Sequence, residues 1–122
     1  MKEVIYVAIG GALGSVSRYL MGILMTSQLA SPYPYATLSV NLAGSLLIGI
    51  LSGIFIKSGS PITQFMLITG FCGGFTTFSA FAFEKHSLLK NGDLLPFAIY
   101  MASSIIIGVL AVVLGLWLSK QL

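Results

Sequence analysis

The stretch GFCGGFTTFSAFAFE, residues 70–84, combines strong hydrophobicity with residues that form helices poorly. Gly73, Gly74 and the β-branched pair Thr76 and Thr77 lower the helix propensity in its middle. A broken helix inside a membrane leaves backbone carbonyls without partners, and it is tolerated only where protein or a polar ligand satisfies them. The stretch therefore predicts a membrane span with a break, whose unwound carbonyls are able to coordinate a small hard cation.

Four phenylalanines run through this stretch at spacings of four, three and three residues: Phe71, Phe75, Phe78 and Phe81. Such a stripe is typical of aromatic residues that pack against other helices or face lipid. It also fits an anion path, because the edge of an aromatic ring carries positive potential. The spacing alone does not decide between these two interpretations.

The rest of the chain also has the composition of a membrane protein. Its 122 residues are 57% hydrophobic and only 7% charged, with a mean hydropathy of +1.00. Soluble domains carry about 25% charged residues. The net charge of +3 comes from scattered groups without a basic patch, so no nucleic-acid partner is expected. The sequence shows no nucleophile–base pair and no metal-ligating cluster, so an enzyme is not expected either.

Four apolar stretches are each long enough to cross a bilayer as a helix, which takes about 20 residues. They cover residues 4–25, 36–56, 62–83 and 94–119 of a single domain, 1–122. Turn-forming residues separate them, in segments 31–34, 57–61 and 90–93. Lys2 before an apolar run is a weak signal-peptide feature, but Glu3 cancels its charge, so we expect a first spanning helix. The sequence thus predicts an all-α, multi-pass protein of the cell membrane.

The positive charges do not favour one orientation in the membrane. Four spans place both termini on one side, and the Lys and Arg residues divide three against three. The two sets are Lys2, Lys57 and Lys120 on the side of the termini, and Lys85, Lys90 and Arg18 on the other. Because cytoplasmic loops normally carry an excess of Lys and Arg, the balance predicts insertion in both orientations and permits an antiparallel homodimer. Alternatively, one residue or a partner subunit fixes the orientation.

Small residues recur at four-residue spacing in three of the spans. The sets are Gly10 and Gly14; Ser45, Gly49 and Gly53; and Ser104 and Gly108. Small residues let helix backbones approach closely in lipid, so these positions predict helix contacts within a subunit or across a dimer.

Polar side chains inside the spans are costly and normally face protein or water. Arg18 either anchors its helix or attracts anions, and Asn41 either bonds a neighbouring helix or donates an N–H group to an anion. Ser103 and Ser104 offer hydroxyl donors, although a serine can also bond back to its own helix. Glu84 is expected at the far end of the third span. With no acidic residue at mid-span, a passive pathway, or no transport at all, is favoured over proton-driven transport.

Three motifs follow one another along the first three spans: GGALGSVSRY at 10–19, TLSVNLAGS at 37–45 and GFCGGFTTFSAF at 70–81. They resemble the patterns GGxxGxxxRY, TLxVNxxG and GFCGGxTTFSTF of the CrcB/Fluc family of fluoride channels. The resemblance covers nearly the whole chain. It implies a dual-topology, antiparallel dimer with two fluoride pores along the subunit interface.

The resemblance also implies roles for single residues of the pore. Phe78 and Phe81 would be the aromatic pair that lines it, and Asn41 would be a pore-facing donor. Tyr100 and Ser104 match polar positions of the fourth helix beside the pore. The first two phenylalanines of the stripe would then be packing residues.

Further implied features lie outside the pore itself. Arg18 would stand at a vestibule, and the backbone carbonyls of Gly73 and Thr76, from both subunits, would hold a central structural Na⁺. Ala80 and Ala82 replace the Thr and Ser that family members often carry, so the polar track along the pore is thinner here.

The expected function is passive efflux of fluoride across the cell membrane, which protects the cell from fluoride toxicity. The expected partners are the fluoride ion, membrane lipid, and a second copy of the chain or a homologous second subunit. Two other functions are compatible with a small four-span chain. A small multidrug exporter would need a glutamate deep in the first span, where this chain has only Glu3 at the edge. A non-transporting membrane subunit would conduct nothing.

Overall fold

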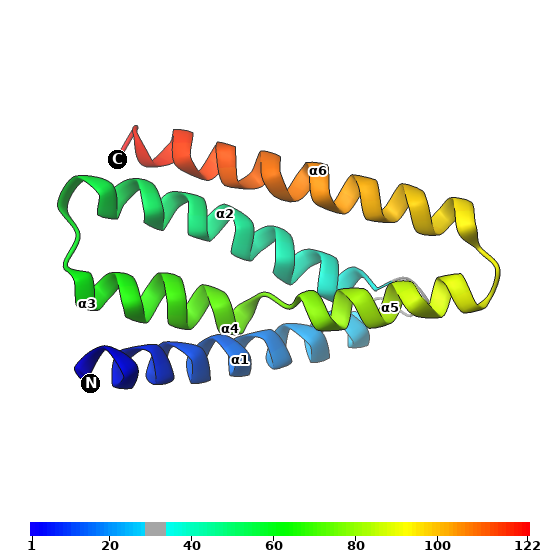
Figure 1. Ribbon diagram of the computed structural model, residues 1–122, viewed down its shortest axis with the longest axis horizontal. Coiled ribbons are helices and arrows are strands. Elements are labelled where there is room, and N and C mark those ends of the chain that lie inside the picture. The colour runs from blue at the N-terminus through cyan, green and yellow to red at the C-terminus, as the bar shows by residue number, and fades with distance from the viewer. Residues whose placement is uncertain (29–33) are drawn as a thin grey trace.

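The computed structural model describes residues 1–28 and 34–122 (Figure 1). The turn predicted at 31–34 therefore lies outside the described residues, except for Pro34, which directly precedes a long helix. All regular structure in the described part of the chain is helical. The predicted all-α membrane fold is confirmed, because four of the described helical segments are long and apolar enough to cross a bilayer.

The described helices form four long segments, which we call rods, and the third rod is made of several elements. The first, second and fourth rods are single helices: α1 (Lys2–Gln28), α2 (Tyr35–Ser58) and α6 (Leu94–Ser119). The third rod consists of four successive elements: α3 (Pro61–Gln64), η1 (Phe65–Cys72), α4 (Gly73–Phe75) and α5 (Phe78–Lys90). The element η1 is wound as a π-helix. The third rod continues to Lys90, beyond the predicted end of its span at residue 83. Glu84 and Lys85 consequently lie inside a helix rather than at its far end.

The rods lie side by side, with both chain termini at the same end (Figure 1). The last helix, α6, packs mainly on α2, whereas α1 packs mainly on η1 and α4. At the opposite end a short turn joins α5 to α6 (Figure 1). Gly92 in this turn has a φ of +80°, a conformation that other residues rarely adopt.

Glycines bring α1 into direct backbone contact with the third rod. A Cβ atom on Gly10 or Gly14 would overlap the carbonyl oxygen of Met66 or Phe71, respectively. From the other side, a Cβ atom on Gly70 would lie 3.0 Å from the Cα atom of Gly10. Because lipid offers no hydrophobic driving force between helices, such close approach supplies the van der Waals contact that holds them together.

The predicted small-residue positions of α2 meet α6 in the same way. A Cβ atom on Gly49 would lie 3.0 Å from the Cα atom of Gly115, and one on Gly53 would overlap the side chain of Ser119. At Gly108, by contrast, the only heavy atom near such a Cβ atom is Oγ of Ser45, at 3.9 Å. The two helices thus pack tightly toward the chain termini and leave space near their middle.

Candidate ion pathway

The third rod is broken at two residues, Thr76 and Thr77. Thr76 has ψ 156° and Thr77 has φ −147°, so both are extended between the end of α4 and the start of α5. The sequence placed the break over residues 73–77, and this was too wide, because Gly73 and Gly74 remain helical.

Neither glycine is unwound, and Gly74 serves helix contact. A Cβ atom on Gly74 would lie 3.1 Å from the Cα atom of Gly11 on α1. A larger residue would therefore push α1 away from the third rod. The low helix propensity of glycine is an aqueous property, and packing against α1 overrides it here.

Asn41 of α2 satisfies the broken backbone. Its Nδ2 group donates to the carbonyl oxygen of Thr77 at 3.1 Å, and its Oδ1 atom accepts from the Thr77 backbone N–H at 2.8 Å. A side-chain amide carries two N–H donors, and the bond to Thr77 uses one of them. The side chain of Asn41 is therefore a bridge between helices that retains a donor.

The break also removes the normal helical donors from several carbonyl groups, including those of Gly73 and Thr76. In an unbroken helix the N–H group of Thr77 would bond the carbonyl of Gly73, and that of Ala80 would bond Thr76. Here the Thr77 N–H bonds Asn41, and the Ala80 N–H bonds Oγ1 of Thr77 at 3.2 Å, as in a helix N-cap. These two carbonyls are the pair that the family resemblance assigns to Na⁺.

The surroundings of Gly73 suit an external ligand. Gly73 is exposed, and no heavy atom of the described residues lies within 4 Å of the place where its Cβ atom would stand. Backbone carbonyl oxygens are hard ligands of the kind that hard cations prefer. The donor set therefore fits a cation such as Na⁺, with two oxygens from one copy of the chain.

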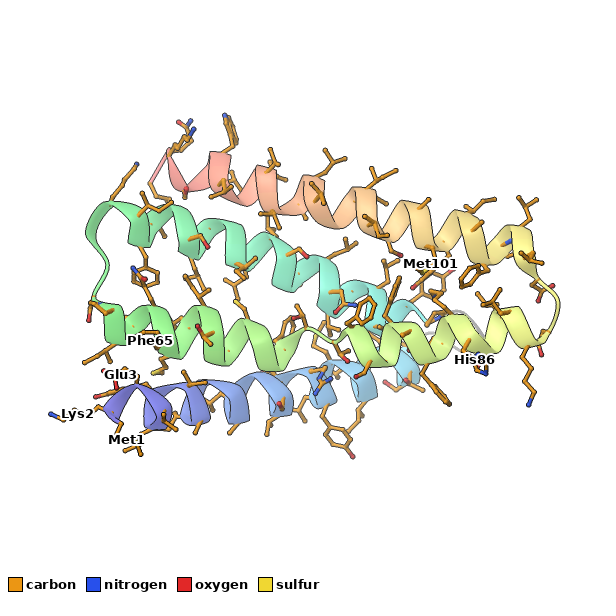
Figure 2. All side chains as sticks on the ribbon, viewed as in Figure 1. Met1, Lys2, Glu3, Phe65, His86 and Met101 are labelled. Carbon is orange, nitrogen blue, oxygen red and sulfur yellow. The ribbon has the colours of Figure 1, made fainter. Side chains whose placement is uncertain are left out.

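An open groove of about 560 Å³ runs beside the break, between α2, α5 and α6. Met101 is one of its lining residues, and Figure 2 labels it on α6. The lining also contains six of the residues assigned to the site from the sequence: Asn41, Gly73, Thr76, Phe78, Phe81 and Ser104. The structure therefore brings four of the five predicted pore residues and both predicted cation ligands to one surface, whereas Tyr100 does not line the groove.

The two predicted pore phenylalanines differ in exposure. Phe78 is 78% exposed and Phe81 is 7% exposed, with their ring centroids 6.0 Å apart and their planes at 40°. Phe71 and Phe75 stack on each other at 5.7 Å and do not line the groove. The stripe thus divides at the helix break into packing rings before it and groove rings after it.

The polar residues of α6 also separate into two kinds. Ser103 donates to the carbonyl of Tyr100 at 3.1 Å, one turn back along its own helix. Ser104 lines the groove, and its buried hydroxyl has no hydrogen-bond partner among the described residues. The ring of Tyr100 stacks on Phe81 with centroids 6.1 Å apart, and its hydroxyl donates to the carbonyl of Pro34 at 3.4 Å. Of these three residues of α6, Ser104 is therefore the one whose hydroxyl lies at the groove.

Arg18 stands apart from this cluster. It is half-buried on α1 and is not a lining residue of the groove. Its predicted place at a vestibule remains a prediction.

Three polar residues close to the site had no predicted role in it: Thr37, Glu84 and Lys85. Glu84 accepts a hydrogen bond from the Thr37 hydroxyl at 2.5 Å, which ties α5 to α2. Lys85 is fully buried beside the rings of Phe81 and Tyr100. The signal for Lys85 was present in the sequence, since it stands four residues after Phe81 and so on the same helix face.

With four described helical segments able to cross a bilayer and a groove beside the broken third one, the chain has the architecture of a multi-pass helical membrane protein. Its sequence matches the family described as CrcB-like protein, Camphor Resistance (CrcB), over residues 5–116. The chain therefore belongs to the CrcB family, as the three motifs indicated.

Relatives of known description agree with this assignment. The chain is 44% identical to the fluoride-specific ion channel FluC of Flavobacterium psychrophilum, with 100% of both chains covered. It is 50% identical to a channel of the same description from Allorhizobium ampelinum, over 100% of this chain and 99% of the other. The corresponding channel of Chlorobium luteolum is 46% identical, over 97% of this chain and 92% of its own length.

Proposed function

We propose that this chain is a fluoride channel that lets the anion leave the cell passively. The observation that carries the proposal is the groove, which brings Asn41, Phe78, Phe81 and Ser104 together beside the broken helix. The relatives described as fluoride-specific ion channels support the choice of ion. Fluoride enters cells as the neutral acid HF and dissociates at neutral pH, so a channel for the anion needs no coupled energy source to remove it.

The lining of the groove accounts for selectivity. Asn41 contributes an N–H group that its bond to Thr77 leaves free, and Ser104 contributes an unengaged hydroxyl. The edges of the Phe78 and Phe81 rings carry positive potential. A narrow path of fixed donors replaces the hydration shell of a small anion better than that of a larger one, which is the general logic of selectivity filters.

The complete channel is proposed to be an antiparallel dimer with two pores. Broken backbone is not tolerated in contact with lipid, yet Gly73 is exposed in the single subunit, and Phe78 beside it is 78% exposed. A second copy would cover this surface and complete each pore. Two copies would also bring four carbonyl oxygens, from Gly73 and Thr76 of each, around one central Na⁺. A homologous second subunit would serve the same purpose.

The decisive experiment is ion release from liposomes that contain the purified protein. We expect rapid release of fluoride and no release of chloride. Phe78→Ile and Phe81→Ile should each slow fluoride release at least about tenfold, because they remove the ring edges from the path. Phe83→Ile is the matched control, since Phe83 is 72% exposed on the same helix and does not line the groove.

Two results would contradict the proposal. Equal rates for fluoride and chloride would exclude a selective fluoride channel. No release, together with normal folding of the Phe78→Ala, Phe81→Ala double variant, would support a non-transporting subunit instead.

A further inference from the structure

Lys85 is buried where a lysine would normally reach water. It is 2% exposed, whereas Lys90 on the same helix is exposed. Lysines near the ends of membrane helices usually extend along the helix to place the ammonium group in the interface. Lys85 instead points into the bundle, so its charge must find compensation there.

Two aromatic rings supply part of this compensation. Nζ of Lys85 lies 3.0 Å from the ring centroid of Tyr100 and 5.2 Å from that of Phe81. The face of an aromatic ring attracts a cation, but it does not replace a hydrogen-bond acceptor. An ammonium group has three N–H donors, and Nζ of Lys85 has no hydrogen-bond partner within the described ranges 1–28 and 34–122.

The neighbouring carboxylate of Glu84 does not fill this role. Consecutive residues of a helix point about 100° apart and do not face each other. Glu84 is directed to α2, where it accepts from Thr37, whereas Lys85 is directed to Tyr100 on α6. No ion pair joins Glu84 and Lys85 in the part of the chain that the structure describes. The positive charge on the α6 side is therefore unpaired.

This charge stands next to the groove on the helix face that carries the groove rings. Phe78, Phe81 and Lys85 follow at spacings of three and four residues, which places them in one row along α5. Phe81 both lines the groove and contacts Lys85, and its ring stacks on that of Tyr100. An anion that moves along the row past the edge of Phe81 next meets the ammonium group of Lys85.

We infer that the Lys85 ammonium group is a binding station for a small anion at the end of the pathway beyond Phe81. The inference deepens the proposed fluoride channel and rests on it. The two rings hold the ammonium group from one side, and its unused N–H groups bind the anion. Apolar surroundings strengthen this attraction, while the adjacent Glu84 carboxylate weakens it enough for the anion to leave, which conduction requires.

The test is the dependence of fluoride release on fluoride concentration, measured in liposomes with the full-length protein. Lys85→Met should raise the half-saturating fluoride concentration by about tenfold. It should leave the maximal rate equal to or above that of the wild type, because a weaker station releases the anion faster. Lys85→Arg keeps the charge and should stay within about threefold of the wild type. Lys90→Met is the control, because it removes an exposed lysine from the same helix.

The outcomes separate the inference from the proposed function. If the wild type releases no fluoride, the proposed function fails, and the inference fails with it. If the wild type conducts but Lys85→Met and Lys90→Met both match it, Lys85 is a structural lysine hydrated by water, and only the inference is overturned. Loss of a buried charge should not impair folding, and Lys85→Gln provides a second neutral variant. A raised half-saturating concentration in both neutral variants but not in Lys90→Met supports the station.

Discussion

Asn41 uses both the N–H group and the oxygen of its side-chain amide to bond the backbone of one residue, Thr77. The sequence left two roles open for this residue, a bond between helices or a donor to an anion. The structure shows the first role, and the second N–H of the amide keeps the second role possible. A sequence motif identifies such a polar residue but not its partner, because Thr77 lies 36 residues away along the chain.

Replacement of this contact should be costly. Asn41→Ala leaves the backbone N–H of Thr77 without its partner, and one unsatisfied buried group costs about 1–3 kcal/mol. We expect the variant to melt several degrees below the wild type in detergent, as followed by thermal unfolding of the purified protein. Ser103→Ala is the control, since that hydroxyl only bonds its own helix. An unchanged melting temperature for Asn41→Ala would show that the break is held in another way.

For the third rod, the sequence predicted the existence of the helix and of its break but not their exact limits. Apolar length was enough to predict its existence, and Gly and Thr content was enough to predict a break. The exact position depended on packing, because the glycines that weaken a helix in water are the residues that admit α1 at Gly11 and Gly74. Its end was also placed too early, since Glu84 and Lys85 look like boundary residues until their buried partners on α2 and α6 are known.

The contact between α1 and the third rod should tolerate no methyl group. In Gly14→Ala the new Cβ atom would overlap the carbonyl oxygen of Phe71, and backbone cannot move as a side chain can. We expect a loss of about 1–3 kcal/mol in the free energy of unfolding, measured by reversible denaturation in detergent. Gly22→Ala on the same helix should be neutral, because no heavy atom within residues 1–28 and 34–122 lies within 4 Å of its Cβ position. Equal stability of the two variants would contradict the packing described for α1.

The open carbonyls of Gly73 and Thr76 predict a specific effect of Na⁺ on stability. A ligand that binds only the folded state at about 100 times its dissociation constant stabilises by about 2.7 kcal/mol. We therefore expect the melting temperature of the purified protein to rise with NaCl. N-methylglucamine chloride at equal ionic strength controls for screening and should have no such effect. Identical melting curves in the two salts would argue against the proposed Na⁺ site.

In the molecule as a whole, exposed lysines lie at both ends of the long axis. Both termini lie at one end (Figure 1), which places Lys2 and Lys120 there, together with Lys57 in the last turn of α2. Lys90 lies at the opposite end, where α5 turns into α6. His86, on the same helix, projects away from α6 (Figure 2). Sequence counting treats every lysine alike, but Lys85 is enclosed among rings, so the count in the loops is less even than three against three.

Orientation should nevertheless respond to single charges. Lys57→Gln combined with Lys120→Gln removes positive charge from the end with the termini and should bias the chain toward one orientation. If an antiparallel dimer is required, this variant alone should lose fluoride release. Co-expression with a Lys90→Gln chain, biased the opposite way, should restore it. Cysteine labelling of each end from outside intact cells measures the orientation, and full activity of a uniformly oriented chain would contradict the antiparallel arrangement.

The link between Asn41 and Thr77 also has a consequence for biogenesis. Because synthesis proceeds from the N-terminus, the second span leaves the ribosome before the third, and Asn41 precedes its partner by 36 residues. The amide that will close the opened peptide is thus already in the bilayer when Thr76 and Thr77 arrive. The third span can then enter hydrocarbon against a waiting partner instead of exposing bare peptide groups. The order of translation thereby helps the broken third rod to insert, in addition to the contact that holds it once folded.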